Sequence, residues 1–496
     1  MHSQALIEKT FSSNFKVQPY KSLRLATGDF IFTSAAYPAT FDSSIAILIK
    51  TDSLLQVKWI KRYKVFHKDL LRTIHPSLDG NLFIAGSARE NFNQQSGGSF
   101  LKIDTAGNVI WHKVYSDSYD DGIIHIAQQA DSSLVIFNRQ GVSGYPIKVI
   151  HTDKNGNILS WRTFYKGNIA LNGAIAGPAY NVFYMAGVYQ SPGSTYNSLF
   201  VCAFTASSFK WLKEYQFGRN VNTESVALLT DGNIGVAGNI ADSIFPNTQN
   251  AWAMKLDTSG NVIFANEYGQ QQAYNEGVWE VIPAENGSMV LAGQANTALG
   301  AQALAFKVSN NGTVQFCKSY GNLAYQYFYD GFMLNDGRLL LNGSDLNLTY
   351  SAIVSSDGTS ACSSSNRTFL TATMQPVMVN PAVTVNSLLK TPVSPALNIT
   401  SFNVNENLLC SGTVGLPEMN DFKNGITIFP NPVSQILNIK ATSAEPVVFE
   451  IYDNSGRMVM TTEKVSIDVS GITEGFYLLK VKTRNHSALK KFQIIR

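Results

Sequence analysis

The chain has 496 residues, a formal net charge of +3 and a charged fraction of 15%, which is low against the roughly 25% of soluble domains. Its 38 basic and 35 acidic residues nearly balance, so the charge gives no case for binding nucleic acid or an anionic membrane surface. No apolar run approaches the roughly 20 residues that a transmembrane helix needs.

The first six residues have neither the basic nor the apolar region of a secretory signal. We therefore expect either a cytoplasmic protein or one whose signal was removed before this numbering begins. The C-terminal part of the chain decides between the two.

A motif of about fifty residues repeats along the chain. Each copy closes with a large aromatic residue and a tyrosine, as in Asn108-Val-Ile-Trp-His-Lys-Val-Tyr115. Extending the period backwards leads to Phe11, which predicts an isolated final strand over residues 5–11. The closing tyrosines are Tyr63, Tyr115, Tyr165, Tyr215, Tyr268 and Tyr320, at intervals of 50 to 53 residues.

Each copy contains four strand-like segments joined by turns such as Asp79-Gly80 and Asp104-Thr-Ala-Gly-Asn108, which are strong hairpin signals. Four antiparallel strands per 40–50 residues are typical of a propeller blade. A linear solenoid would need polar caps at both ends, whereas an isolated first strand can complete the last blade. The sequence predicts an all-β, seven-bladed β-propeller over residues 1–366, closed by its N-terminal strand.

The aromatic residues at the centre of the motif are predicted to pack between neighbouring blades. Because the position repeats in every blade, packing between blades is favoured over a role in stacking on a ligand. These residues are Trp59, Trp111, Trp161, Trp211, Phe264 and Phe316.

A polar residue also recurs just before the predicted first strand of each copy, at spacings of 51 to 54 residues. If first strands line the channel, these residues form a ring at one mouth that could bind Ca²⁺, a cationic ligand or a sugar. The favoured interpretation is a turn cap or interblade hydrogen bond that repeats with the blade. The six are Asp69, Asp121, Asn172, Glu224, Glu276 and Asp330.

No motif of catalysis, metal binding or cofactor binding is present. The seven histidines show no metal-ligand spacing, although His75 and His125 fall on channel-side strands of adjacent blades. We predict no catalytic residue, no metal and no cofactor. Carboxylate pairs contributed by different blades stay open, because sequence spacing cannot exclude them.

Residues 367–412 are nearly uncharged and rich in Val, Pro, Thr, Ser and Asn, which predicts a β-rich strap packing on the propeller. Cys362 and Cys410 bracket this segment. A disulfide between them would anchor the strap in an oxidising compartment, and four free buried thiols are the alternative. Residues 413–424 are predicted to be a linker, and residues 425–496 a small Ig-like β-sandwich of short strands.

The last segment resembles the type A C-terminal sorting domain of the type IX secretion system. The resemblance lies in Ile428-Phe-Pro-Asn-Pro432, Ile451-Tyr-Asp-Asn-Ser-Gly456, Gly475-Phe-Tyr-Leu-Leu-Lys-Val481 and Lys490-Lys-Phe492, in the family's order and spacing. The positions carried over as the sorting signal are Phe429, Pro430, Asn431, Pro432, Gly456, Gly475, Tyr477, Lys490 and Lys491.

This resemblance implies export by the type IX secretion machinery of a Bacteroidota-type bacterium. It implies a secreted or outer-membrane surface location, with cleavage of the domain and attachment to lipopolysaccharide. It also implies a signal peptide outside this numbering, and it favours the disulfide. The repeat, as in residues 102–115, resembles propeller repeats common in surface proteins that carry this domain, which indicates the fold and not the activity.

Three functions follow as hypotheses. The first is a non-catalytic propeller that binds a surface protein or a glycan. The second is a polysaccharide-active hydrolase or lyase, suggested by aromatic-rich segments such as Tyr325-Gln-Tyr-Phe-Tyr329; two carboxylates roughly 5–10 Å apart in an aromatic cleft would favour it. The third is a structural subunit of an outer-membrane complex, which would show a large apolar patch.

Overall fold

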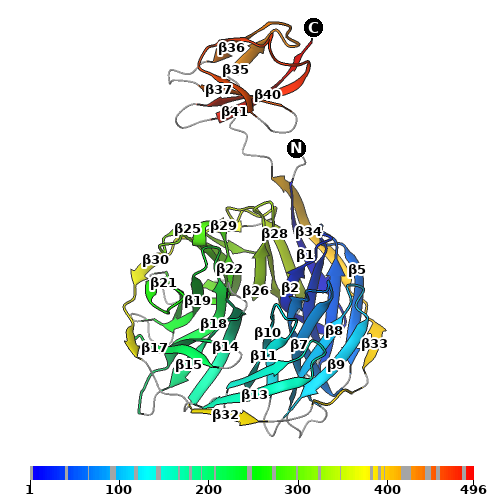
Figure 1. Cartoon of the computed structure of the whole chain (residues 1–496), viewed down its shortest axis with the longest axis vertical. Helices are drawn as coiled ribbons and strands as arrows, with labels where there is room; N and C mark the ends of the chain where they lie inside the picture. The colour runs from blue at the N-terminus through cyan, green and yellow to red at the C-terminus, as the bar shows by residue number, and fades with distance from the viewer. Residues whose placement is uncertain are drawn as a thin grey trace. The chain divides into compact units, whose positions relative to one another are not determined.

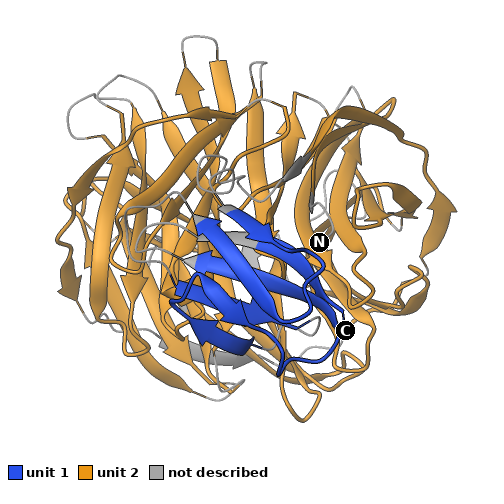
Figure 2. Cartoon of the chain, turned by 90° about the horizontal axis from the view of Figure 1, so that it is seen from above, with its two compact units in different colours: residues 1–4, 414–496 blue, residues 5–413 orange. Residues whose placement is uncertain are grey.

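The chain forms two compact units, residues 5–413 and residues 1–4 with 414–496, which Figure 2 distinguishes by colour. The part of the chain that the structure, a computed structural model, describes is all-β, with one 3₁₀ turn at Glu285–Gly287 and no α-helix. The described residues are 4–38, 43–64, 66–89, 96–116, 121–140, 147–165, 168–177, 181–190, 193–205, 208–242, 248–270, 275–297, 300–321, 325–346, 348–362, 364–379, 384–388, 392–395, 397–414, 426–441, 448–453, 458–482 and 487–495.

In its described residues the larger unit contains seven antiparallel sheets, each built on four strands. Six of them use four strands that are consecutive in the chain. These strands are β2 (Lys16–Arg24), β3 (Phe30–Tyr37), β4 (Ile45–Thr51) and β5 (Val57–Lys64); β6 (Lys68–Pro76), β7 (Leu82–Arg89), β8 (Gly97–Ile103) and β9 (Val109–Tyr115); β10 (Asp121–Gln128), β11 (Leu134–Gln140), β12 (Ile147–Thr152) and β13 (Ile158–Tyr165); β14 (Asn168–Ala176), β15 (Phe183–Gln190), β16 (Ser198–Phe204) and β17 (Phe209–Gln216); β18 (Val221–Leu228), β19 (Ile234–Ala241), β20 (Gln249–Leu256) and β21 (Val262–Gly269); β22 (Glu276–Pro283), β23 (Met289–Thr297), β24 (Gly300–Val308) and β25 (Val314–Tyr320).

The seventh sheet joins the two ends of the repeat region. It consists of β26 (Gln326–Met333), β27 (Leu339–Asp345), β28 (Leu348–Val354) and the N-terminal strand β1 (Gln4–Ser12). β1 pairs antiparallel with β28, placing Phe11 opposite Thr349. The first strand of each sheet contacts the first strand of the next, and β26 contacts β2, so the sheets form a closed, propeller-like ring (Figure 1).

The repeated tyrosine explains how one sheet is fastened to the next. The buried Tyr115 donates its hydroxyl to the carbonyl of Gly156, 2.7 Å away, in a hairpin of the following sheet, and Trp111 packs on the same glycine. The equivalent pairs are Tyr63 with Gly107, Tyr215 with Gly260, Tyr268 with Gly312 and Tyr320 with Gly358. The glycines have positive φ, and a Cβ at Gly107 would lie 2.9 Å from the Trp59 ring, so this turn requires glycine.

Replacing Tyr115 with phenylalanine is expected to lower the free energy of unfolding by about 1–2 kcal/mol, because a buried carbonyl loses its donor. The check is the urea midpoint followed by tryptophan fluorescence. Tyr196→Phe is the control, since the Tyr196 side chain is exposed. Equal midpoints for Tyr115→Phe and the control would contradict this role of the hydroxyl.

After the seventh sheet, the chain runs back around the ring as a strap. Its strands are added one at a time to the outer edges of six sheets, in the order β25, β21, β17, β13, β5 and β1. They are β29 (Ser364–Asn366), β30 (Leu370–Thr373), β31 (Val377–Val379), β32 (Thr384–Leu388), β33 (Asn398–Ser401) and β34 (Asn405–Val414).

The strap contacts the seventh edge strand, β9, through an isolated β-bridge instead of an added strand. Val114 and Val393 exchange two backbone hydrogen bonds of 2.7 and 3.0 Å. Pro392 and Pro395 flank Val393, and neither has an N–H to donate, so a ladder cannot continue through them. A disulfide between Cys362 and Cys410 joins the two ends of the strap.

The described residues of the smaller unit form two antiparallel sheets around one apolar cluster that includes Leu437, Ile451 and Leu479. One sheet contains three strands and the other four. The strands are β35 (Ile426–Phe429), β36 (Ile436–Ala441) and β39 (Ser466–Asp468), then β38 (Met458–Thr462), β37 (Val448–Tyr452), β40 (Gly475–Lys482) and β41 (Ser487–Ile494).

Candidate functional site

A β-bulge interrupts the first strand of every sheet in the larger unit. The pairing register shifts between Leu71 and Thr73 in β6, and between Val278 and Glu280 in β22, and the other first strands behave alike. A bulge bends its strand and redirects a side chain. Residues at and beside the seven bulges line a cavity of about 520 Å³ at the centre of the ring.

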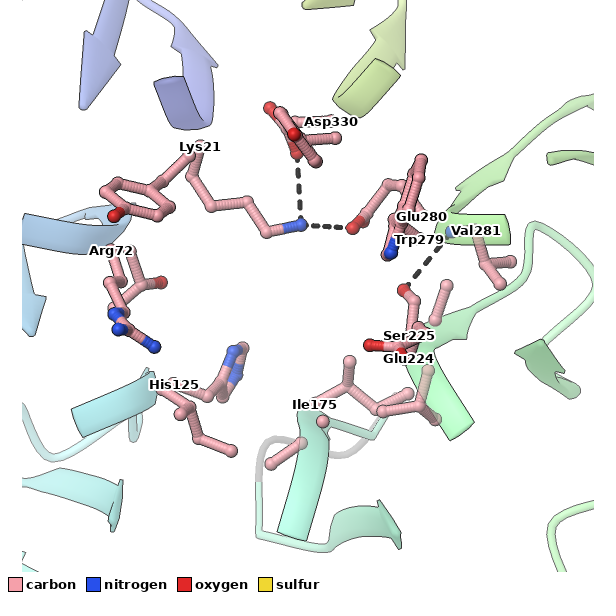
Figure 3. Close-up of a pocket in the computed structure, with 18 of the residues that line it drawn as sticks. Lys21, Arg72, His125, Ile175, Glu224, Ser225, Trp279, Glu280, Val281 and Asp330 are labelled. Carbon is pink, nitrogen blue, oxygen red and sulfur yellow. Dashed lines mark hydrogen bonds and ion pairs between the residues drawn. The ribbon is translucent and has the colours of Figure 1, made fainter. Parts of the chain in front are cut away.

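An ion-pair network occupies one side of this cavity (Figure 3). Lys21 Nζ contacts the carboxylates of Glu280 and Asp330, the second at 3.0 Å. The backbone N–H of Ser22 donates to Asp330 Oδ2 at 2.6 Å, and the Ser22 hydroxyl donates to the same oxygen. Three first strands from three sheets, β2, β22 and β26, therefore meet at one ammonium group.

Burial and charge act against each other in this network. Burial raises the pKa of Glu280 above its usual range, while Lys21 opposes that rise. Burial alone would lower the pKa of Lys21, but the attraction of Glu280 and Asp330 is larger and raises it. Lys21 therefore stays protonated over the physiological range and cancels part of the negative charge beside it.

Aromatic rings lie next to the carboxylates. The centroid of Trp279 is 5.4 Å from that of Tyr329 and 5.6 Å from that of Tyr327, and the two tyrosine rings stack at 6.1 Å. Trp279, Tyr329 and Tyr20 line the cavity. We call Trp279, Tyr327 and Tyr329 the aromatic platform.

Two histidines from adjacent sheets meet on another side. The rings of His75 and His125 pack edge to face with centroids 4.4 Å apart. Burial lowers the pKa of His75 to about 4, with a smaller contribution from Lys21. Burial also lowers the pKa of His125 well below its usual value, so both rings are neutral at pH 7.

The six polar residues predicted to form a ring do not share one structural position. Asn172, Glu224 and Asp330 line the cavity, whereas Asp69 and Glu276 lie outside its lining. Both are three residues before the bulge of their strand. Asp69 accepts a hydrogen bond from the Phe66 N–H at 3.0 Å, which is a local cap. The side chain of Asp121 lies outside the described residues.

Sequence reasoning missed the residues that dominate the cavity, namely Lys21, Arg72, Trp279 and Glu280. In five of the described sheets, the glycine of the hairpin turn after the first strand gives a signal for Arg72 and Trp279, and for the bulge residues beside Lys21 and Glu280. The residue eight positions before this glycine occupies the bulge. The bulge residues found in this way are Tyr20, Arg72, Glu224, Trp279 and Tyr329, which precede Gly28, Gly80, Gly232, Gly287 and Gly337.

Among the described residues, three side chains that could serve as metal ligands come together at one place, with their ligand atoms within 4.8 Å of one another: Glu8, Cys362 and Cys410. Both cysteines are in the disulfide, so their sulfurs are not thiolate ligands.

Residues 427–495 match the protein family described as the secretion system C-terminal sorting domain. The sorting domain predicted from the sequence is confirmed. It indicates a secreted or cell-surface protein exported by the type IX secretion system. In the described part of the chain, no helix is long and apolar enough to cross a membrane.

The described positions predicted as the sorting signal lie in the smaller unit: Phe429, Gly475, Tyr477, Lys490 and Lys491 belong to strands, and residues 430–432 form the bend after β35. Asn431 accepts a hydrogen bond from the Gln493 N–H at 2.9 Å and donates to the Lys491 carbonyl at 3.2 Å, which ties the start of the domain to β41. Tyr477 is buried and donates to the Thr473 carbonyl. Lys491 lies over the Phe476 ring, and Gly456 is outside the described residues.

Seventy chains of solved structures match this chain, and no curated protein matches it. A mannose phosphorylase from Leishmania mexicana is 10% identical, covering 72% of this chain and 88% of its own, with a TM-score of 0.30. Sqt1 from Chaetomium thermophilum is 11% identical, covering 67% and 82%, with a TM-score of 0.38. The polysaccharide lyase Uly1 is 10% identical, covering 67% and 89%, with a TM-score of 0.37. At these values the similarities carry no argument about function.

Proposed function

We propose that the larger unit is a seven-bladed β-propeller over residues 1–366, with residues 367–412 as its strap. A linker over residues 413–424 then leads to an Ig-like sorting domain over residues 425–496. The seven sheets, the contact of β26 with β2 and the pairing of β1 with β28 support the propeller. The two facing sheets of the smaller unit support the sandwich.

We further propose that a Bacteroidota-type bacterium delivers the chain to its surface, where the sorting domain is removed and lipopolysaccharide is attached. The sorting-domain match supports the export step. The Cys362–Cys410 disulfide supports passage through an oxidising compartment.

We infer that the central cavity binds a glycan without cleaving it. The aromatic platform beside Glu280 and Asp330 carries this inference. The apolar face of a sugar ring packs on an aromatic ring, while its hydroxyls donate to carboxylates. A cavity of about 520 Å³ also has the volume of small-molecule sites, which is roughly 300–1,000 Å³.

Trp279→Ala is expected to weaken glycan binding at least about tenfold, because the sugar loses its stacking surface. A glycan array with the purified chain identifies the ligand, and calorimetry on wild type and variant measures the change. Tyr196→Ala, an exposed aromatic residue outside the cavity lining, is the control. An array on which the wild-type chain binds no glycan would contradict the proposal and favour a protein partner.

A polysaccharide-active enzyme is the second candidate. Glu280 and Asp330 contact the same ammonium, so their carboxylates lie within roughly 6 Å, a separation typical of retaining glycosidases. However, Lys21 Nζ contacts both carboxylates, where a glycosidase must place the glycosidic oxygen. New reducing ends appearing when the chain is incubated with a glycan that it binds would support the enzyme instead.

A further inference from the structure

Arg72 faces the cavity from the side opposite the acidic residues. It occupies the bulge of β6, and its guanidinium points into the open space, across from Glu224, Ser225 and Trp279 (Figure 3). Its side chain is exposed rather than packed under neighbouring residues. The position of the bulge therefore presents a cation to whatever the cavity binds.

The charge of Arg72 is not neutralised by the protein. Among the described residues, no acidic side chain forms an ion pair with it. Its guanidinium lies over the Tyr20 ring, 5.6 Å from the centroid, which is a cation–π contact and leaves the charge in place. Lys21, in contrast, is held by two carboxylates. The cavity thus has one cation engaged by the protein and one available to a ligand.

The other groups on the Arg72 side leave room for an anion. His75 and His125 are neutral at pH 7 and carry no competing charge. Glu280 and Asp330 lie across the cavity, where Lys21 partly neutralises them. A planar guanidinium can give two parallel hydrogen bonds to a carboxylate, which a neutral sugar cannot accept in the same way.

We propose that Arg72 binds the carboxylate of a uronic acid, so that the glycan recognised by the cavity is an acidic one. This rests on the proposed glycan binding. The sugar ring stacks on the aromatic platform, its hydroxyls donate to the carboxylates of Glu280 and Asp330, and its own carboxylate pairs with Arg72. Specificity for the acidic glycan thus comes from one side of the cavity and general sugar affinity from the other.

The experiment is calorimetry on the full chain with an oligogalacturonate, its carboxyl-reduced counterpart and a sulfated neutral oligosaccharide. The wild type is expected to bind the uronate at least tenfold more tightly than the reduced form. Arg72→Ala should remove that preference while leaving the affinity for the reduced form unchanged. Arg72→Lys should keep part of it, because lysine retains the charge and loses the planar pair of donors.

The variants separate the two proposals. Equal wild-type affinity for the uronate and its reduced form, unchanged preference in Arg72→Ala, or tighter binding of the sulfated sugar would overturn the inference about Arg72. Trp279→Ala should weaken both sugars together. Failure of the wild type to bind any of the three, or any glycan on an array, would overturn the glycan proposal itself.

Discussion

Replacing both Cys362 and Cys410 with serine is expected to lower the free energy of unfolding of the larger unit by about 4 kcal/mol. The disulfide closes a loop with a sequence separation of 48 residues, and the loss of conformational entropy in the unfolded chain gives that magnitude. The loop contains the strap strands that cover the edges of the sheets. The loss is therefore expected to affect the unit as a whole rather than one hairpin.

The location of the disulfide strengthens this expectation, because it lies where the ring closes. The Cys362 N–H donates to Glu8 on β1 at 3.3 Å. Near the other end of the strap, Glu406 pairs with Lys9 on β1 at 3.0 Å and accepts the Val57 N–H at 2.7 Å. The cross-link therefore holds the strap against the strand that joins the last sheet to the first.

Urea unfolding followed by tryptophan fluorescence measures this change in the larger unit alone, because all six tryptophans lie there. A reductant should lower the midpoint of the wild type and leave that of the double variant unchanged. The free cysteines Cys202 and Cys317 remain in both proteins and are buried. A double variant as stable as the oxidised wild type would contradict a stabilising role of the disulfide.

The sequence predicts the repeated sheets well because one side-chain contact recurs in most of them. The Tyr115 hydroxyl donates to a hairpin glycine in the next sheet. Since this contact recurs from sheet to sheet, both the tyrosine and the glycine turn repeat in the sequence with the period of the fold. The N-terminal copy of the motif lacks both the tyrosine and the glycine of this contact. Phe11 has no hydroxyl, and the turn facing it has Leu55 at φ 59° in place of glycine, with its carbonyl bound by Lys9.

The cavity could not be predicted from the same period. Loops of different length separate the closing tyrosine from the next first strand. Residues spaced by one repeat period therefore occupy different positions along their first strands, and only some of them line the cavity. Glu224 occupies a bulge, Glu276 lies three residues before one, and Asp330 follows one. Distances measured from the hairpin glycine, which lies in the same sheet as the bulge, identify the cavity positions.

The pairing of the strap is also beyond sequence reasoning. β30 and β31 are exposed along their whole length, so no alternation of apolar and polar residues marks an inner face. They are held by backbone hydrogen bonds to β21 and β17, which any residue except proline can make. Composition can indicate an extended segment here, but it cannot give the register.

Glu276→Gln is expected to stabilise the larger unit at pH 8.5 and to have little effect at pH 4.5. The Glu276 side chain is almost fully buried, and burial raises its pKa to about 8, although Arg367 opposes the rise. Between its usual pKa near 4.5 and about 8, the folded protein binds a proton that the unfolded chain has released. Stability therefore falls as the pH rises through this range, by at most about 5 kcal/mol at roughly 1.4 kcal/mol per pH unit.

The urea midpoints of wild type and Glu276→Gln, measured from pH 4.5 to 8.5, test this prediction. The difference should grow with pH, because glutamine has no charge to bury. Glu267→Gln is the matched control: Glu267 is also buried, but it is paired with Arg219 at 2.6 Å, so its variant should be less stable than wild type at pH 8.5. Loss of stability in Glu276→Gln at pH 8.5 would mean that Arg367 holds Glu276 ionised, making this carboxylate a buried ion pair instead of a neutral acid.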